Sequence, residues 1–425
     1  MRHAKHLRHL GWLLALSWLA AGPATALGQE WTQWRGSQRD GKAAAELLPS
    51  ALPSELERRW SVEVGRGYSS PVVAGDRIFL LTREADEEVV RSIDLNSGAT
   101  IWRQAYAAPY EVNVSATRHG DGPKSTPVLS GGKLYVFGID GILSCFDADS
   151  GDLVWRREFA SEYPTTSPIY GASASPLVDG GNVFIHVGGH HDGAIAAFNV
   201  NTGEPAWTTR GDGPGHASPI LLELHGQRQL VIQTDTHIEG VTADDGQILW
   251  QIPFTTDYDQ SIITPLVDGE QLILSGLDRG VFAVEIVRDG DSWTSVELWR
   301  NDDLPMYMSS PVLIGSRLFG FTHKRSGQFF ALDVATGQTL WTSPGREGDN
   351  AALVGIGDRL LTLTDGGELM VLAADAAEFA PLARYEVAQS GTYAHPVPTR
   401  HGVLIKDSSS LALWQISGAG TEDER

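Results

Sequence analysis

One short element recurs along most of this chain: a Ser or Thr followed by Pro and then by two or three apolar residues. Successive copies, including a degraded one at Ala352–Gly355 and a last one at His395–Val397, are 42 to 56 residues apart. A period in the forties is that of a propeller blade made of four short strands. The chain is therefore predicted to be an all-β, eight-bladed β-propeller. The intact copies are Ser70-Pro71, Thr126-Pro127, Ser175-Pro176, Ser218-Pro219, Thr264-Pro265 and Ser310-Pro311.

A second element, Gly-x-x-x-Trp, repeats in step with the first. Gly permits the positive φ of a tight turn. A Trp on an outer strand can cover the apolar gap between two blades while its N–H finds a partner there. The fifth blade has a longer turn and the seventh lacks both residues, so we expect Trp299 and Tyr385 to take the role in these blades. The predicted structural tryptophans are Trp60, Trp102, Trp155, Trp207, Trp250, Trp299 and Trp341.

The two ends of the repeat region complement each other. Trp60 precedes the first Ser-Pro element and lies in a strand-like run without a blade, whereas His395–Ile416 supplies only three strands. We therefore expect Leu56–Val64 to complete the last blade, which would leave no free sheet edge at the seam. The predicted division is a signal peptide at 1–26, an N-terminal extension at 27–55, the propeller at 56–416 and an acidic tail at 417–425.

The first residues have the pattern of an export signal. Arg2, Lys5 and Arg8 precede the apolar stretch Leu10–Ala21, and Ala24-Thr25-Ala26 offers a cleavage site, with Gly28 as a second choice. The alternative is an uncleaved membrane anchor, although the apolar stretch is short for a span. No Cys follows it that could carry a lipid. We expect a periplasmic or secreted protein with no membrane span in the mature chain.

Charge and cysteine content exclude two classes of protein. The formal net charge is −21, which argues against nucleic acid as a partner because phosphate is bound through Lys and Arg. The only cysteine, Cys145, lies in an apolar strand-like run and is expected to be a small buried hydrophobe. A single cysteine permits no internal disulfide, no Cys-rich metal site and no haem attachment motif.

The two repeats resemble those of the PQQ-like β-propeller superfamily. The opening Trp31–Gly36, with Arg39-Asp40-Gly41, is similar to the start of exported members of that superfamily from planctomycetes and related bacteria. The resemblance covers residues 31 to about 416. The superfamily includes quinoprotein alcohol dehydrogenases and non-enzymatic BamB-like scaffolds, so the resemblance implies the fold and leaves the function open.

A candidate binding site follows from the position of the loops. In a propeller the loops that enter the innermost strands converge on one mouth of the central channel, and in this chain those loops precede the Ser-Pro elements. Polar and aromatic side chains around a concavity suit a small molecule or a peptide; the alternative is a water-filled polar funnel. The candidate residues are Arg66, Tyr68, Lys124, Tyr170, His216, Asp259, Gln260, Tyr307, Met308, Tyr393 and His395.

No metal site is predicted from the sequence. His186, His190 and His191 are the best candidates, but the last two are adjacent and would face opposite ways on a strand, while Gly188 and Gly189 favour a loop. Asp-rich turns such as Asp147–Asp152 are too short for an EF-hand loop and lack its closing Glu.

The resulting functional hypothesis is an exported, non-catalytic scaffold that binds an unidentified protein or small-molecule ligand. We expect it to act as a monomer without a cofactor, so no catalytic residue is assigned. The alternative is a PQQ-dependent quinoprotein oxidoreductase, which would need PQQ with Ca²⁺ and a carboxylate base near the quinone. No calcium-ligand set of that class can be matched to this chain, and no Ser-His-Asp set or phosphate loop occurs at a meaningful spacing.

Overall fold

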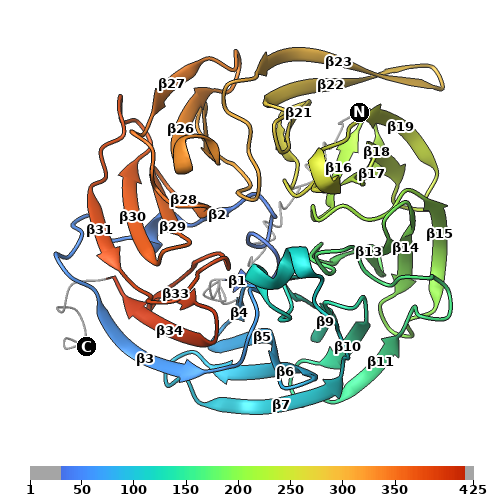
Figure 1. The fold of residues 1–425 in the computed structure, drawn as a ribbon, viewed down its shortest axis with the longest axis horizontal. Helices are drawn as coiled ribbons and strands as arrows, with labels where there is room; N and C mark the ends of the chain where they lie inside the picture. The colour runs from blue at the N-terminus through green and yellow to red at the C-terminus, as the bar shows by residue number, and fades with distance from the viewer. Residues whose placement is uncertain (1–29, 417–425) are drawn as a thin grey trace, which may run out of the picture.

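Each Ser-Pro element stands directly before the innermost strand of a blade. In the computed structural model, which describes residues 30–416, eight sheets surround a central axis like the blades of a propeller (Figure 1). This confirms the predicted all-β, eight-bladed fold. The signal peptide at 1–26 and the acidic tail at 417–425 lie outside the described residues. None of the helices within residues 30–416 is long and apolar enough to cross a membrane.

Every blade has four antiparallel strands, which follow one another from the axis outward. The first four blades are β4 (Val72–Ala74), β5 (Arg77–Glu84), β6 (Glu87–Asp94), β7 (Thr100–Ala107); β8 (Val128–Ser130), β9 (Lys133–Phe137), β10 (Leu143–Asp147), β11 (Leu153–Arg157); β12 (Leu177–Asp179), β13 (Asn182–Gly189), β14 (Asp192–Asn199), β15 (Pro205–Gly211); and β16 (Ile220–Leu224), β17 (Gln227–Gln233), β18 (His237–Thr242), β19 (Ile248–Pro253).

The other four blades have the same arrangement. They are β20 (Leu266–Asp268), β21 (Gln271–Ser275), β22 (Val281–Asp289), β23 (Ser292–Asn301); β24 (Val312–Ile314), β25 (Arg317–Thr322), β26 (Gln328–Asp333), β27 (Thr339–Thr342); β28 (Ala351–Ile356), β29 (Arg359–Thr364), β30 (Glu368–Ala373), β31 (Ala383–Glu386); and β32 (Val397–Thr399), β33 (Gly402–Lys406), β34 (Ser410–Gln415), β3 (Glu57–Glu63). Short 3-10 helices lie in the connections: η1 (Ala45–Leu47), η2 (Val114–His119), η3 (Asp257–Asp259) and η4 (Lys324–Ser326).

The ring closes as the sequence predicted. β3, from the start of the propeller, pairs antiparallel with β34 from its end, and Trp60 lies opposite Leu413. The two chain ends therefore build one blade together, as Figure 1 shows by the blue and red strands lying side by side. Without this outermost strand, blade 8 would have three strands and β34 would be its exposed edge.

A belt of hydroxyl groups around the axis explains the Ser or Thr of the first repeat. The backbone N–H of Thr126 donates to Oγ of Ser175 at 2.9 Å, and the N–H of Ser175 donates to Oγ of Ser218 at 2.9 Å. The same bond links Ser70 to Thr126, Thr264 to Ser310, and His395 to Ser70. In each case the hydroxyl of one blade accepts from the blade before it. The following Pro has no N–H and so leaves no donor unpaired at this buried position.

The Trp and the Gly of the second repeat serve two different blade interfaces. The indole N–H of Trp102 donates to the carbonyl of Ala148 in the next blade at 3.0 Å. Its ring lies against Gly151, where a Cβ atom would approach the ring carbons to 2.6 Å. The corresponding indoles donate to carbonyls of the next blade at 2.9–3.1 Å, namely those of Trp60, Trp155, Trp207 and Trp299.

Three outer-strand positions depart from this arrangement. Trp250 donates to Oε1 of Gln229 in its own blade at 2.8 Å, and the indole nitrogen of Trp341 has no hydrogen-bond partner among residues 30–416. Tyr385 stands where the seventh blade lacks a Trp, and its hydroxyl donates to the carbonyl of Pro53 at 2.7 Å, just before β3 of the next blade. A tyrosine hydroxyl thus makes the link to the following blade that an indole N–H makes elsewhere.

Cys145 lies directly opposite Trp155 in the pairing of β10 with β11. The equivalent positions opposite Trp102, Trp207 and Trp299 carry small residues. Cys145 is a free, buried cysteine, and burial raises the pKa of its thiol to about 12. It therefore fills the space beneath the indole as a small hydrophobe and is not a reactive thiol.

The N-terminal extension lies inside the ring. β1 (Glu30–Trp31) pairs with the inner strand β4, and β2 (Lys42–Ala43) runs parallel to the inner strand β28. Between them, the buried Arg39 donates to the carbonyls of Pro176 and Ser175 at 2.9 and 3.2 Å, and Arg35 donates to the carbonyl of Pro311. Burial lowers the pKa of Arg39 to about 9 and that of Arg35 to about 10. The extension thus ties the inner strands of blades 1, 3, 6 and 7 together from within.

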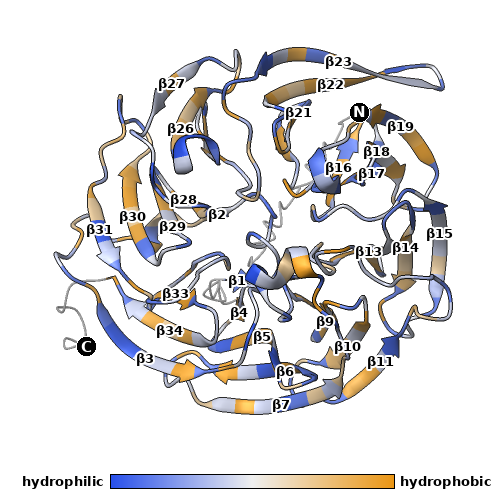
Figure 2. Ribbon diagram, viewed as in Figure 1, coloured by the Kyte–Doolittle hydropathy of each residue, from blue (hydrophilic) through white to orange (hydrophobic). Residues whose placement is uncertain are grey.

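The apolar core is divided among the gaps between neighbouring blades. One cluster, for example, joins Tyr135 and Trp155 of blade 2 to Val183 and Phe198 of blade 3. Figure 2 shows hydrophobic segments along middle strands such as β22 and β30, whereas the outermost strand β3 is mainly hydrophilic. Each blade is therefore stabilised chiefly by its two neighbours.

Two glycines of blade 2 offer a matched test of the Trp–Gly contact. Gly151 and Gly131 both have positive φ, of +80° and +57°, but a Cβ at Gly131 would have nothing within 4 Å. We expect Gly151→Ala to lower the free energy of unfolding by about 1–3 kcal/mol more than Gly131→Ala, because only the first adds a steric clash to the backbone strain. Urea unfolding of both variants measures this difference. Equal losses would show that the indole contributes nothing beyond the turn conformation.

Candidate functional site

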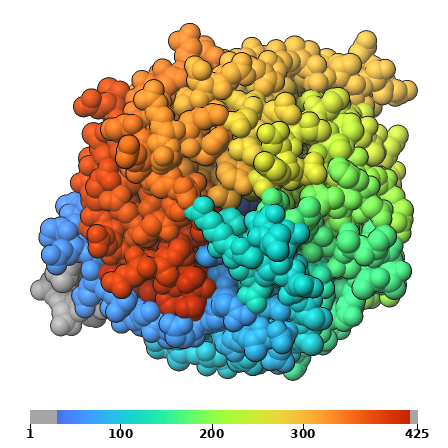
Figure 3. Space-filling model, viewed as in Figure 1, coloured from blue at the N-terminus to red at the C-terminus, as the bar shows by residue number. Residues whose placement is uncertain are grey.

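A cavity of about 560 Å³ lies at the mouth formed by the loops that enter the inner strands. In Figure 3 the centre of this face is hollowed beside the teal segment that contains η2. The structure brings most of the predicted binding residues together in its wall. These are Tyr68, Lys124, Tyr170, His216, Gln260, Tyr307, Met308 and Tyr393.

Three predicted residues do not line the cavity. Arg66 forms an ion pair with Asp121 at 2.7 Å on the outer side of the loop. Asp259 faces the imidazoles of His190 and His191, at 3.5 and 3.8 Å. His395 is buried and packs edge-on against the ring of Trp34, with 4.6 Å between ring centroids.

Sequence reasoning missed the part of the wall that comes from outside the repeat. η2 lies in the connection between the first two blades, and Trp34 comes from the N-terminal extension and donates its indole N–H to Thr264 at 2.9 Å. The one signal in the sequence was the spacing, because the first step between Ser-Pro elements, 56 residues, is the longest. The wall residues that were not predicted are Trp34, Ser115, Arg118, His119, Ser173, Ser218, Tyr258, Ile262, Thr264, Leu277 and Asn350.

η2 is held across the mouth by contacts at both of its ends. The side chain of Asn113 accepts from the N–H of Ser115 at 2.9 Å and caps its start. At its other end Arg118 forms an ion pair with Asp349, which precedes β28 in blade 7, and approaches the hydroxyl of Tyr393 to 3.5 Å. The connection between blades 1 and 2 is thereby fastened to the loop that enters blade 7.

Lys124 gives the cavity a cation without a counter-ion. It is only partly exposed, its Nζ donates to the carbonyl of Tyr170, and no carboxylate among residues 30–416 lies within ion-pair distance of it. Desolvation lowers the pKa of Lys124 to about 8. None of the described wall residues is an Asp or Glu, although the whole chain carries a net charge of −21. The described wall of the cavity therefore lacks the acidic side chains that give the whole chain its negative charge.

Shifted pKa values keep four further groups of the wall neutral near pH 7, namely His119, His216, Tyr68 and Tyr393. Burial lowers the pKa of His216 to about 3, and burial followed by the charge of Lys124 lowers the pKa of His119. Burial also raises the pKa of Tyr68 and Tyr393. Lys124 is thus the cation of the described wall without an ion-pair partner, whereas Arg118 is paired with Asp349.

The arrangement suits binding better than general base catalysis. Ser173 Oγ lies 2.9 Å from Nδ1 of His216, which has the geometry of a nucleophile and its base. A general base works best with a pKa near the operating pH, however, and the pKa of His216 is far below that range. Nε2 of His216 is buried and has no partner among the described residues.

Aromatic rings supply flat contact surfaces around these polar groups. Tyr68 and Tyr393 pack edge to face with 4.8 Å between centroids, and His119 contacts Tyr393 at 5.3 Å. Tyr170 lies edge-on to His216 at 5.8 Å. Rings fixed in this way offer amphipathic contact area at little conformational cost. The cavity therefore favours a flat or apolar group that carries negative charge.

The three histidines considered for metal binding lie in and beside blade 3. His190 and His191 form the turn between β13 and β14, and because His191 has φ of +58° both rings face Asp259. His186 lies within β13, and its Nε2 contacts the carbonyl of Asp212 at 3.0 Å. The three do not converge on one point.

Eight four-stranded blades with these repeats and a central cavity define a PQQ-like propeller. Residues 85–343 match the family described as "Outer membrane protein assembly factor BamB", and the chain belongs to that family. The outer membrane protein assembly factor BamB of Burkholderia pseudomallei is 24% identical over 380 residues, which cover 78% of this chain and 92% of that protein.

Solved structures share the fold. BamB from Moraxella catarrhalis superimposes with a TM-score of 0.62 at 15% identity, covering 86% of this chain and 99% of that one. The quinohemoprotein alcohol dehydrogenase ADHIIG from Pseudomonas putida HK5 superimposes with a TM-score of 0.66, also at 15% identity, covering 93% of this chain and 81% of that one. At this identity the likeness concerns the fold alone, and the two proteins that share it are named as BamB and as an alcohol dehydrogenase.

The low pKa of Lys124 predicts that this residue destabilises the fold at neutral pH. Between about pH 8 and the ordinary lysine pKa of 10.5 the unfolded chain holds a proton that the folded chain has lost, so stability rises with pH across this window. We expect Lys124→Met to be more stable than the wild type at about pH 7, by about 1–3 kcal/mol, and the difference to shrink towards pH 10.

Urea unfolding at several pH values measures this difference. Lys133→Met, at a partly exposed lysine of the same blade, is the control and should follow the wild-type profile. A profile of Lys124→Met that runs parallel to that of the wild type would contradict the assignment.

Proposed function

We propose that this protein is an exported, non-catalytic propeller that binds a negatively charged, flat or apolar group in its central cavity. The bound group is either a small molecule or the anionic end of a partner protein's segment. Export rests on the basic and apolar pattern of residues 1–26. The protein relatives named as outer membrane protein assembly factors support a scaffold role, since they match over most of both chains.

The observation that carries this proposal is the charge of the cavity wall. Lys124 remains without a carboxylate partner in a chain that has 53 acidic residues against 32 basic ones. A buried, unpaired ammonium is unfavourable for folding. An anionic ligand would give it a counter-ion, with Arg118 as a further contact.

The quinoprotein alternative fits this wall poorly. Calcium takes six to eight oxygen ligands, with carboxylates prominent among them. The described wall residues offer amide and hydroxyl oxygens, such as those of Gln260 and Asn350, but neither a carboxylate for calcium nor one to serve as the base. Lys124 and Arg118 could attract the carboxylates of PQQ, so binding of the quinone alone would not establish the enzyme.

A matched set of probes tests the proposal. We expect 1-naphthoate and short peptides ending in an aromatic residue with a free carboxylate to bind, and 1-naphthylmethylamine and amidated peptides not to bind. Lys124→Met should weaken binding of the anionic probes by about tenfold or more, in line with the loss of a charge-assisted hydrogen bond. Isothermal titration calorimetry measures the affinities, and the peptide and naphthoate arms distinguish a protein segment from a small molecule.

The pH dependence identifies the group responsible. In the free protein the Lys124 ammonium is lost as the pH rises through about 8, whereas Arg118 stays charged and Tyr68 and Tyr393 stay neutral. Affinity for naphthoate should therefore fall between about pH 7 and about pH 9.5 in the wild type and stay level in Lys124→Met. Equal pH profiles in the two proteins would remove Lys124 from the site.

Titration with PQQ and Ca²⁺, followed by absorbance and thermal melting, tests the quinoprotein alternative. Calcium-dependent, stoichiometric binding of PQQ with reduction of an artificial acceptor by an alcohol would overturn the non-catalytic proposal. Binding of PQQ without a calcium requirement or turnover would place PQQ among the anionic ligands.

A further inference from the structure

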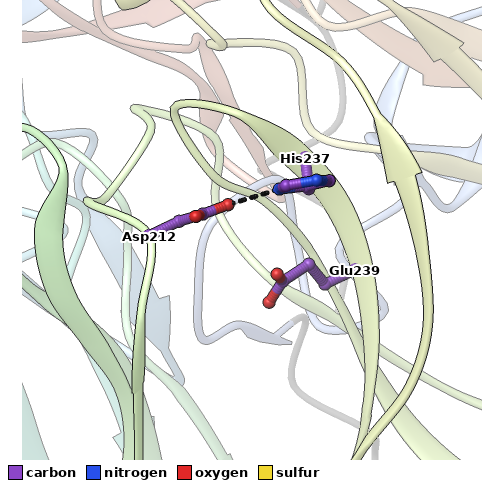
Figure 4. Close-up of side chains that lie close together, drawn as sticks. All are labelled: Asp212, His237 and Glu239. Atoms are coloured by element: carbon purple, nitrogen blue, oxygen red, sulfur yellow. Dashed lines mark hydrogen bonds and ion pairs between the residues drawn. The ribbon is translucent and has the colours of Figure 1, made fainter.

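Three potential metal ligands meet at the interface between blades 3 and 4, outside the central cavity. Asp212 follows β15 directly, and His237 and Glu239 lie on β18. One ligand atom from each residue lies within 4.8 Å of the others. Figure 4 shows the side chains converging from the two blades, with Oδ2 of Asp212 bonded to Nδ1 of His237 at 2.7 Å.

Glu239 is the member of this group that lacks a sufficient partner. It is 4% exposed, and one of its carboxylate oxygens accepts from Nε2 of Gln251 at 2.5 Å. The other oxygen has no hydrogen-bond partner among residues 30–416, and the carboxylate points towards Asp212 and His237 without bonding to either (Figure 4). A buried carboxylate is expensive to desolvate unless it is paired or bound to a metal.

No permanent cation neutralises this group. Within residues 30–416 no Lys or Arg lies at ion-pair distance from Asp212 or Glu239, and the only ion pair of Asp212 is with His237. The geometry therefore leaves both carboxylates without a Lys or Arg partner, and a bound metal ion would supply the missing positive charge.

The surroundings hold the ligands in place. Oδ2 of Asp212 accepts from the hydroxyls of Thr234 and Thr236 at 2.8 and 2.5 Å, and the carbonyl of Asp212 contacts Nε2 of His186. Such bonds orient metal ligands in many proteins. A small cavity of about 50 Å³ adjoins Asp212 and Glu239, and His186 and Arg210 also line it, whereas His237 does not; its volume is enough for an ion or a water molecule.

We propose that Asp212, His237 and Glu239 bind a divalent transition-metal ion of the Zn²⁺ class, which links blades 3 and 4. One imidazole and two carboxylates form a mixed nitrogen and oxygen set, which suits Zn²⁺ and its neighbours better than Ca²⁺, whose ligands are all oxygen. A metal held by two different blades stabilises the folded ring, because the unfolded chain has no such site.

The test uses the mature chain without an affinity tag, titrated with Zn²⁺ by calorimetry and with Co²⁺ by absorbance. We expect one equivalent of each to bind, Co²⁺ to give the visible bands of nitrogen and oxygen coordination, and Zn²⁺ to raise the melting temperature. Glu239→Gln keeps the shape and the contact with Gln251 but removes the charge, and it should weaken Zn²⁺ binding by about 100-fold; His237→Ala should do the same.

The control is His191→Asn, at an exposed histidine of the neighbouring turn whose positive φ Asn tolerates. It should bind Zn²⁺ like the wild type. Circular dichroism of each variant without metal shows whether it is folded, and Glu239→Gln removes no packed atoms. Absence of stoichiometric Zn²⁺ and Co²⁺ binding by the wild type, or unchanged binding by folded Glu239→Gln, would overturn the proposal. Loss of binding in His191→Asn alone would place the metal at the His191–Asp235 pair instead.

Discussion

Each blade can bury its apolar faces only against its two neighbours, and this constraint shapes the rest of the molecule. The hydroxyl belt near the axis and the Trp–Gly contact near the rim meet this requirement at the two ends of most blades. Each contact is directional, because a blade donates to the next and accepts from the one before. A chain built in this way must close, and the pairing of β3 with β34 supplies the contact that would otherwise be missing at the seam.

The same construction decides where a site can be. The inner strands are short and their backbone groups meet at the axis, so the polar N-terminal extension occupies the ring's interior, with Arg35 and Arg39 bonded to carbonyls of the surrounding strands. The mouth of the ring remains open. Its loops are not part of the hydroxyl belt, so they can vary in length and composition. The cationic cavity lies there because η2, Trp34 and the loop residues before the Ser-Pro elements all reach that space.

Much of the fold could be predicted from the sequence, because each copy of the repeat carries the same residues for the same packing contacts. The prediction of mouth residues failed where a position follows another rule. His395 stands in the place of the Ser in its repeat and donates its N–H to Ser70, so its side chain is buried under Trp34. Arg66 is bridged to Arg83 of its own blade. η2 and Trp34 lie outside the repeat, and Asp212 is brought to His237 and Glu239 only by the contact between two blades, which no local pattern records.

The distribution of charge connects the two proposed sites. The carboxylate of Asp235 is close enough to those of Asp212 and Asp259 for their negative charges to raise its pKa. Asp259 is next in the chain to Gln260, which is a residue of the cavity wall. The cavity itself contains no carboxylate among its described wall residues. A metal ion at Asp212 would neutralise carboxylate charge, just as an anion in the cavity would neutralise the charge of Lys124. The protein between the two sites screens charges less than water does. Neutralising the carboxylates would therefore weaken the electric field that they produce in the cavity. Occupation of the metal site should therefore strengthen anion binding, because it reduces the negative potential that the carboxylates project into the cavity.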